Sequence, residues 1–241
     1  MAIDPINGEI FYVDKPYGWT SFDAVKRIRG VLHKRTGRKR LKVGHAGTLD
    51  PLATGVLIVC SGRATKRIDE LQAGEKEYVA TLQLGATTPS FDLETEIDAT
   101  YPWQHITREL IAEVLPQFTG TVMQVPPVFS AVKVDGRRAY KFARKGREVE
   151  LKPKELVISE LEVLDWEPPL LTIRVACSKG TYIRALARDI GQALQSGAHL
   201  TALRRTRVGS VTIDQCSSID TIVDFLNAVE VIVPADDPNQ E

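Results

Sequence analysis

The sequence has little of several features that mark other classes of protein. It holds three cysteines in 241 residues, all far apart and none in a Cys-x-x-Cys pair, which argues against a zinc cage or a thioredoxin-type site. Apolar runs are only a few residues long, as at residues 56–60, so no transmembrane helix is expected. The first ten residues carry two acids and no basic residue, unlike a signal peptide. We therefore expect a cytoplasmic protein with reduced thiols.

Metal-ligand spacings and the glycine-rich fingerprint of dinucleotide-binding proteins are also missing. A metal site and a dinucleotide site therefore have no support in the sequence. The composition, with 43% hydrophobic and 26% charged residues, is that of a globular protein able to bury a core.

The chain also lacks net charge, because 31 basic residues balance 31 acidic ones. The two signs are nevertheless separated along the sequence. Three windows, residues 26–42, 133–154 and 174–207, contain 25 of the basic residues and only 4 of the acids, a local net charge of +21. If the windows meet on one face, that face would attract a polyanion such as RNA. The alternative is three unrelated solvated faces.

Periodicity and turn residues predict both strands and helices. We expect strands at residues 9–14, 56–60, 78–84, 156–164, 170–176 and 208–213, and helices at residues 65–71, 107–118, 182–194 and 217–229. A further helix, capped by Thr20 or Ser21, should bury Phe22, Val25, Ile28 and Leu32, before a basic linker over residues 30–42. Asp135-Gly136 is typical of a hairpin turn. Hairpin signals outnumber βαβ signals, which favours an α+β fold with a mixed, mostly antiparallel central sheet flanked by helices.

One non-periodic segment stands out: GHAGTLDPLATG at residues 44–55. Its three glycines let the backbone approach a ligand closely, and Pro51 restricts the chain directly after Asp50. A carboxylate held so rigidly suits nucleophilic or general-base chemistry. The local pattern alone leaves open that Asp50 caps a turn and that His45 bonds to the backbone.

This segment resembles the catalytic motif of the bacterial tRNA pseudouridine synthase B (TruB) family. Other segments match further motifs of the family in the same order: DKPYGWTS at residues 14–21, KEY and LG at residues 76–78 and 84–85, PPVFSAVKVDG at residues 126–136, CSKGTYIR at residues 177–184, and AHLTALRR at residues 198–205. The resemblance covers about residues 8–213 and is specific, because six motifs occur in order.

The resemblance implies a pseudouridine synthase fold and an isomerase that converts uridine 55 in the T-loop of tRNA to pseudouridine. The glycosidic bond would move from N1 to C5 of a base that is flipped out of the stack. The resemblance also implies that the reaction requires neither a metal nor a cofactor. By motif match, Asp50 would be the essential aspartate, and Arg184 would pair with it and favour its charged form. Tyr78 would stack on the target base and take part in catalysis.

The same resemblance implies a set of substrate-binding residues besides Tyr78. Tyr182 and Leu203 would line the flipped uracil, and His45 would lie near the extruded nucleotide. Lys15 and Lys66 match motif lysines that would contact the RNA backbone or support the structure of the site.

A thumb-like insertion at about residues 124–154 would grip the T-arm stem-loop as a mobile lid. The residues expected to contact the RNA backbone are Lys133, Arg137, Arg138, Lys141, Arg144, Arg204 and Arg205. One monomeric catalytic domain is expected over residues 1–233, with a short acidic tail at residues 234–241. Many family members carry a C-terminal PUA domain, whereas only 28 residues, with seven acids and no basic residue, follow Ile213 here. We therefore expect a short form without that domain.

Two other interpretations stay open at this point. The basic windows also suit an RNA chaperone that remodels the tRNA elbow, with catalysis secondary or absent. The simplest alternative is an α+β domain with scattered basic faces, which six ordered motifs disfavour.

Overall fold

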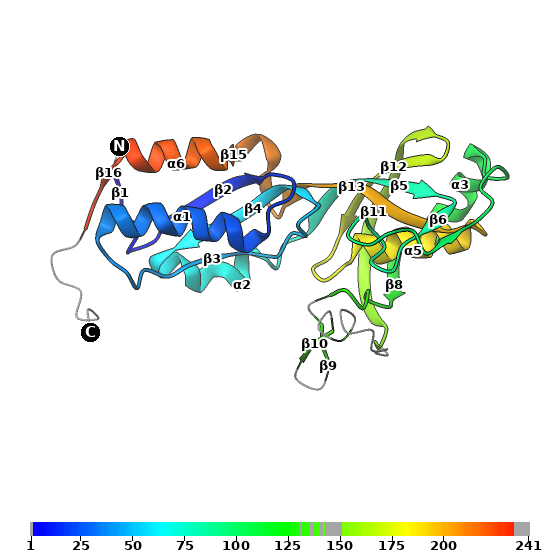
Figure 1. Ribbon diagram of the computed structural model, residues 1–241, viewed down its shortest axis with the longest axis horizontal. Coiled ribbons are helices and arrows are strands. Elements are labelled where there is room, and N and C mark those ends of the chain that lie inside the picture. Colours follow the sequence, from blue (N-terminus) through cyan, green and yellow to red (C-terminus); the bar gives the residue numbers. More distant parts are fainter. Residues whose placement is uncertain (1, 131, 135–136, 140–141, 143–150, 234–241) are drawn as a thin grey trace. The chain divides into compact units, whose positions relative to one another are not determined.

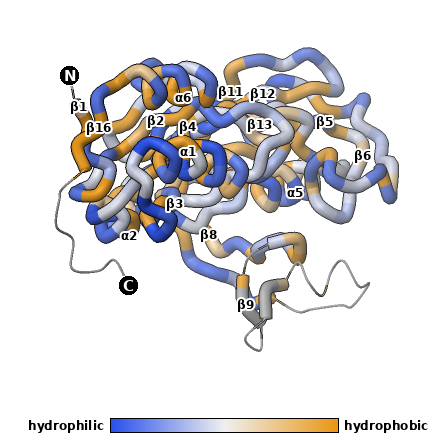
Figure 2. Tube along the Cα trace, turned by 60° about the vertical axis from the view of Figure 1, so that its left-hand side comes forward, coloured by the Kyte–Doolittle hydropathy of each residue, from blue (hydrophilic) through white to orange (hydrophobic). Residues whose placement is uncertain are grey.

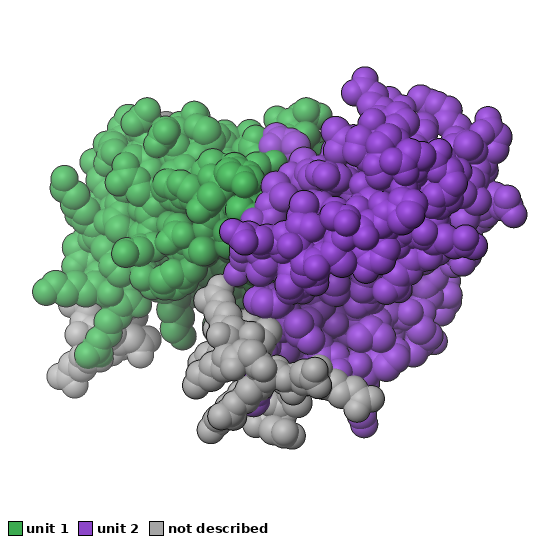
Figure 3. Space-filling model, turned by 45° about the vertical axis from the view of Figure 1, so that its right-hand side comes forward, with its two compact units in different colours: residues 1–74, 205–241 green, residues 75–204 purple. Residues whose placement is uncertain are grey.

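The computed structural model describes residues 2–130, 132–134, 137–139, 142 and 151–233 (Figure 1). Its contacts divide the chain into two compact units, unit 1 with residues 1–74 and 205–241, and unit 2 with residues 75–204 (Figure 3). Each unit combines helices with strands, which confirms the predicted α+β class. No described helix is long and apolar enough to cross a membrane. The single catalytic domain over residues 1–233 stays a prediction.

Unit 1 contains part of a ten-stranded sheet. Its elements are β1 (Ala2–Ile3), β2 (Ile10–Lys15), α1 (Ser21–Thr36), β3 (Val43–His45), β4 (Thr54–Ser61), the 3₁₀ helix η1 (Gly62–Arg67), α2 (Ile68–Leu71), β14 (Val211–Thr212), η3 (Ile213–Gln215), β15 (Ser217–Ser218), α6 (Ile219–Ala228) and β16 (Glu230–Val231). β4 lies antiparallel to both β2 and β3, and β15 lies parallel to β2. The strands predicted at residues 9–14 and 56–60 are therefore confirmed.

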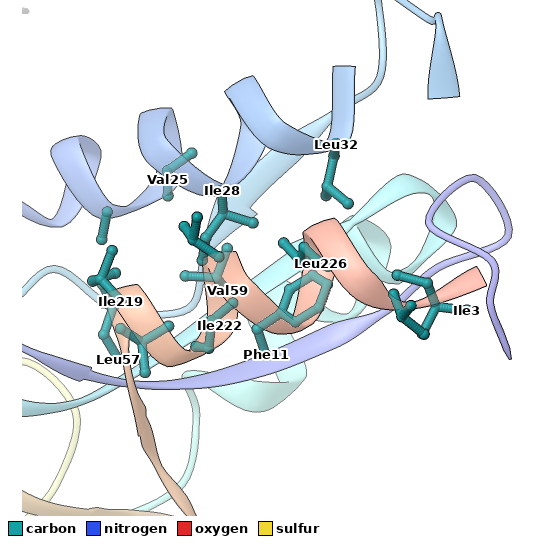
Figure 4. Packing of buried hydrophobic residues seen from close by; sticks show 14 of the residues in the cluster. Ile3, Phe11, Val25, Ile28, Leu32, Leu57, Val59, Ile219, Ile222 and Leu226 are labelled. Atoms are coloured by element: carbon teal, nitrogen blue, oxygen red, sulfur yellow. The ribbon is translucent and has the colours of Figure 1, made fainter. Parts of the chain in front are cut away.

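The core of unit 1 explains why residues 56–60 are apolar without interruption. Leu57 and Val59 on β4 join a cluster with residues of α1 and α6, including Ile28 and Leu226 (Figure 4). Alternate residues of the same strand, such as Ile58, join a second cluster. Because successive strand residues point to opposite faces, a strand covered on both faces needs apolar residues throughout.

The observed bounds and burial of α1 contradict two predictions. The prediction of a basic linker at residues 30–42 is wrong, because the helix continues to Thr36 and is followed by Gly37, which has a φ of 69°. Phe22 is not buried but 56% exposed, with the Arg29 guanidinium 5.5 Å from the centre of its ring. The buried stripe runs through Ser21, Val25, Ile28 and Leu32, and Phe22 lies about 100° around the helix from Ser21.

Unit 2 contains an antiparallel sheet in the order β5-β12-β11-β8. Its elements are β5 (Lys76–Leu84), β6 (Ala86–Thr87), β7 (Ala99–Thr100), α3 (Arg108–Val114), η2 (Leu115–Phe118), β8 (Gly120–Gln124), β9 (Lys133–Val134), β10 (Arg137–Arg138), β11 (Lys154–Glu167), β12 (Leu170–Cys177) and α5 (Ile183–Ala193). β13 (Ala198–Val208) begins in unit 2 and ends in unit 1. β5, β11, β12 and α5 confirm the elements predicted there.

Predictions at the β9–β10 hairpin and at the C-terminal elements have mixed outcomes. β9 and β10 pair antiparallel, as a hairpin requires, although Asp135-Gly136 itself lies outside the described residues. The strand predicted at residues 208–213 is wrong, because Gly209, with a φ of 57°, turns the chain and β14 pairs back onto β13. The last helix begins at Ile219, and its capping side chain is Ser218 rather than Ser217.

Truncating a side chain in the core cluster that α1, α6 and β4 form together should destabilise unit 1. We expect Leu226→Ala, at a position with 0% exposure, to lower the free energy of unfolding by about 2–5 kcal/mol, because it leaves a cavity in a packed core. Urea denaturation measures the change. The neighbouring Phe225→Ala, at a 39% exposed position, is the control and should cost clearly less. Equal losses would contradict this packing of the core.

Candidate active site

The segment at residues 44–55 forms β3, a loop and the first residues of β4. Gly47 and Gly55 have φ values of 97° and 104°, which L-residues with side chains rarely adopt. A Cβ atom at Gly55 would also overlap the backbone carbonyl oxygen of Arg205. The glycine at position 55 is therefore required both by conformation and by the close approach of β13.

Each backbone carbonyl from residue 47 to residue 51 has a donor. The bonds are Arg205 Nη2 to Gly47 O at 3.2 Å, Arg205 Nη1 to Thr48 O at 3.3 Å, Ser21 Oγ to Leu49 O at 3.0 Å, Ala53 N to Asp50 O at 3.1 Å, Gly18 N to Pro51 O at 2.9 Å and Lys15 Nζ to Pro51 O at 3.3 Å. Side chains from three separate elements thus fix the loop on both sides of Asp50.

Lys15 is the most deeply buried of these donors, with 0% exposure. Its ammonium also donates to Pro16 O at 2.9 Å and to Trp19 O at 2.6 Å. Burial lowers the pKa of Lys15 to about 8, while the nearby Asp50 carboxylate raises it and Arg205 lowers it further. Of the two roles predicted for Lys15, these contacts favour support of the site over contact with the substrate.

Arg205, predicted to contact the RNA backbone, is instead an interior residue with 2% exposure. Besides its bonds to the loop, Nε donates to Val56 O at 2.8 Å. The guanidinium therefore holds the loop against the start of β4, and a side chain so enclosed is not available to an RNA phosphate. An arginine next to another arginine in a basic window gives no local sign of this, which is why sequence reasoning missed the role.

His45 lies on β3, paired through its backbone with Val59. Its ring is partly buried, and its Nδ1 atom is buried without a hydrogen-bond partner. Burial lowers the pKa of His45 below its usual 6.5, and the charge of Arg205 lowers it further. Burial therefore favours the neutral form of the His45 imidazole, against a hydrogen bond with the Gly47 backbone that favours the charged form.

In unit 2, the guanidinium of Arg184 is held inside the fold. Nη1 donates to Ser90 O at 3.2 Å, Nη2 donates to Phe129 O at 3.0 Å, and Nε lies 3.6 Å from the carboxylate of Asp92. Asp92 and Ser90 are themselves buried. Sequence reasoning missed Asp92, because it lies in an acidic stretch that looks like a solvated loop.

Tyr182 occupies the N-cap position of α5, two residues before Arg184, and its side chain makes no capping hydrogen bond. The buried Gln124 side chain accepts from Tyr182 N at 2.9 Å and donates to Tyr182 O at 3.1 Å, which ties the start of α5 to β8. Tyr78 is 9% exposed on β5, and Leu203 and Arg204 are half-buried on β13. Unit 2 therefore carries Tyr78, Tyr182, Arg184 and Leu203 on regular elements.

The other residues predicted to contact the RNA lie at exposed positions, on the β9–β10 hairpin or outside the described residues. Lys66 is exposed on η1. Lys133, Arg137 and Arg138 lie on the β9–β10 hairpin, whereas Lys141 and Arg144 fall outside the described residues. No cluster of three or more His, Cys, Asp or Glu side chains that could hold a metal occurs in the part of the chain that the structure describes. Asp50 belongs to unit 1 and Arg184 to unit 2, and their pairing stays a prediction.

Removing the amine of Lys15 should loosen the loop around Asp50. We expect Lys15→Met to lower the free energy of unfolding by about 2–4 kcal/mol, because three carbonyls lose a charged donor. Denaturant unfolding, with Lys42→Met at an exposed position as the control, measures the loss. Wild-type stability of Lys15→Met would show that the carbonyls do not depend on Lys15.

His45 should make stability depend on pH. Its pKa is lowered on folding, so below about pH 6.5 the unfolded chain binds a proton that the folded chain does not. The free energy of unfolding of the wild type should therefore fall more than that of His45→Gln between about pH 7.5 and about pH 5.5, by at most about 1.4 kcal/mol per pH unit. Parallel pH profiles for the two proteins would exclude a buried, neutral His45.

Comparison with known proteins agrees with the motif pattern. The N-terminal domain of the TruB family pseudouridylate synthases matches residues 33–183, and the tRNA pseudouridylate synthase B C-terminal domain matches residues 184–236. The tRNA pseudouridine synthase B of Parabacteroides distasonis is 65% identical over 95% of this chain and 98% of its own length. That of Phocaeicola vulgatus is 63% identical over 93% of this chain and 95% of its own length.

Solved structures show the same fold. A crystal structure of a Cbf5-Nop10-Gar1 complex matches with a TM-score of 0.68 and 31% identity, over 92% of this chain and 55% of that chain. A structure of an H/ACA RNP bound to a substrate RNA containing 2'-deoxyuridine matches with a TM-score of 0.67 and 29% identity, over 92% and 54% of the two chains. The matches confirm the family predicted from the six motifs, its fold and its class of enzyme, an isomerase. The chain therefore belongs to the TruB family of pseudouridylate synthases.

Proposed function

We propose that this enzyme converts uridine 55 in the T-loop of tRNA to pseudouridine, with Asp50 as the essential carboxylate. The observation that carries the proposal is the loop around Asp50, in which every carbonyl from residue 47 to residue 51 is fixed by a donor. The curated relatives with 63–65% identity are named tRNA pseudouridine synthase B, which supports tRNA as the substrate.

The rigid loop suits a reaction in which one carboxylate must meet one atom of a flipped nucleotide. Catalytic groups lose much of their effect when they are displaced by about 1 Å, so fixing the backbone on both sides of Asp50 positions its carboxylate before the substrate arrives. The two buried cations, Lys15 and Arg205, both donate hydrogen bonds to backbone carbonyls of this loop. Asp50 acts on the uridine once its base has left the stack.

The residues of unit 2 have complementary roles in the proposal. Tyr78 offers an aromatic face to the uracil, and Tyr182 and Leu203 complete the pocket. Arg184 pairs with Asp50 through a guanidinium that the carbonyls of Ser90 and Phe129 already hold in place. Asp92, 3.6 Å from Arg184 Nε, supports the same guanidinium from the side. His45 contacts the extruded nucleotide as a neutral ring.

The carboxylate of Asp50 can be tested directly. We expect Asp50→Asn to lower tritium release from tRNA labelled at C5 of uridine by about four orders of magnitude, because the amide cannot replace the charged group. Asp69→Asn, an exposed carboxylate of the same unit, is the matched control and should keep wild-type turnover. Normal turnover by Asp50→Asn would refute the role of Asp50.

Tritium release also tests the position of the target, whereas tRNA binding and tRNA folding in cells test the chaperone alternative. A tRNA transcript with cytidine in place of uridine 55 should release no tritium, and continued release would refute the specificity for that position. If Asp50→Asn binds tRNA normally and fully restores tRNA folding in cells, binding rather than catalysis is the main activity, and the proposal fails in that respect.

A further inference from the structure

Unit 1 has a groove between α1 and α6 that none of the predicted site residues uses. Its volume is about 720 Å³. The α1 side contributes Lys26, Arg27, Gly30 and Lys34, and the α6 side contributes Val223 and Asn227. We call this the α1–α6 groove. It lies within unit 1, and all of its lining residues are described.

Three of the residues that line the groove, Lys26, Arg27 and Lys34, carry a positive charge. Positions 23, 27, 30 and 34 are separated by four, three and four residues, so they lie along one side of a helix. Lys26, Arg27 and Lys34 are all exposed, and Figure 2 shows α1 largely in hydrophilic colours. The acid at the end of the row, Asp23, accepts from Thr20 N at 2.9 Å and from Thr20 Oγ1 at 2.6 Å as part of the helix cap, so three cations face one carboxylate in the lining.

Gly30 provides an independent observation. It lies in the interior of α1, where glycine is less favourable than alanine because it loses more conformational freedom. A Cβ atom at this position would meet nothing within 4 Å, so no neighbour in the fold requires the glycine. What the glycine does leave is bare helix backbone on the groove surface, which lets a ligand approach α1 more closely than a side chain would permit.

One end of the groove is joined to the catalytic loop. Gly18 and Trp19 line that end, and Gly18 N donates to Pro51 O at 2.9 Å. The ammonium of Lys15 donates both to Trp19 O and to Pro51 O. Trp19 is partly buried, with one part of its ring packed against the core of unit 1. An aromatic side chain beside cations is a combination that proteins use to bind an RNA strand, by stacking bases and holding phosphates.

We propose that the α1–α6 groove binds the sugar-phosphate backbone of the tRNA substrate, as a second RNA site beside the catalytic loop. Lys26, Arg27 and Lys34 hold the phosphates, Gly30 lets the strand approach the helix, and Trp19 offers a stacking surface at the end near Pro51. The proposal rests on the proposed function for the identity of the RNA as tRNA. It assigns a role to the first basic window, which none of the predicted contacts used.

The charge of the groove is tested by tRNA binding at several salt concentrations. We expect the double variant Lys26→Gln, Arg27→Gln to bind full-length tRNA transcript at least about tenfold more weakly. The slope of log K against log salt should fall by about 0.7–0.9 for each phosphate that the variant no longer neutralises. The matched control is Lys39→Gln, Arg40→Gln, which removes equal charge from exposed positions of the same window outside the groove. Equally weakened binding by both double variants would overturn the proposal.

Gly30 gives a test that changes no charge. We expect Gly30→Met to bind tRNA at least about fivefold more weakly while its melting temperature rises by about 2 °C, because the side chain fills the groove but favours the helix. Gly30→Ala should show the same rise with a smaller loss of binding. Wild-type affinity in Gly30→Met would overturn the proposal, since a strand held against α1 cannot tolerate that side chain.

The proposed isomerase activity and the proposed groove site can be refuted independently of each other. Binding is measured by fluorescence anisotropy and needs no turnover, whereas wild-type tritium release tests the isomerase. Wild-type protein that binds tRNA through the groove but releases no tritium would refute the proposed function and support the groove. Normal release, with groove variants that bind tRNA like the wild type, would refute the groove alone.

Discussion

The structure of unit 1 depends on two cations buried against the backbone of a single loop. A loop with glycines at positions 44, 47 and 55 has many accessible conformations, and holding one of them costs conformational entropy. Lys15 and Arg205 oppose this cost with charge-assisted hydrogen bonds, which are about twice as strong as those between neutral groups. Because both side chains are nearly inaccessible to solvent, water does not compete for the carbonyls they hold.

The two cations are not interchangeable in this arrangement. Arg205 reaches Gly47, Thr48 and Val56 with separate nitrogens of a planar group, so it joins the loop to β4 in a defined orientation. Lys15 gathers Pro16, Trp19 and Pro51 around one ammonium and so joins the loop to the turn before α1. Each cation carries a cost of desolvation, which shows in the lowered pKa of Lys15. Hydrogen bonds to the backbone carbonyls offset this cost, so each buried cation depends on the carbonyls that accept from it.

Sequence reasoning was successful where the signal is local. Alternating or continuous apolar residues located β2, β4, β5, β11 and β12, because strand burial follows directly from side-chain period. It failed where position depends on the rest of the fold. Phe22 looks apolar enough for a core, yet Ser21 occupies the buried stripe in order to bond Leu49. Arg205 looks like a phosphate ligand, and only the approach of β13 to Gly55 shows why it turns inward. Asp92 has no distinguishing neighbour in sequence at all.

The separated charges of the sequence illustrate how secondary structure decides what a basic window can do. As a linker, residues 30–42 would carry their cations in many orientations, and their net charge alone would attract RNA. The helix α1 instead includes the first part of this stretch, and it places Arg27 and Lys34 two helical turns apart on one side, with Gly30 between them. A fixed row of cations beside exposed backbone has a shape as well as a charge, so it can favour an RNA strand in one position over the same strand elsewhere on a basic surface.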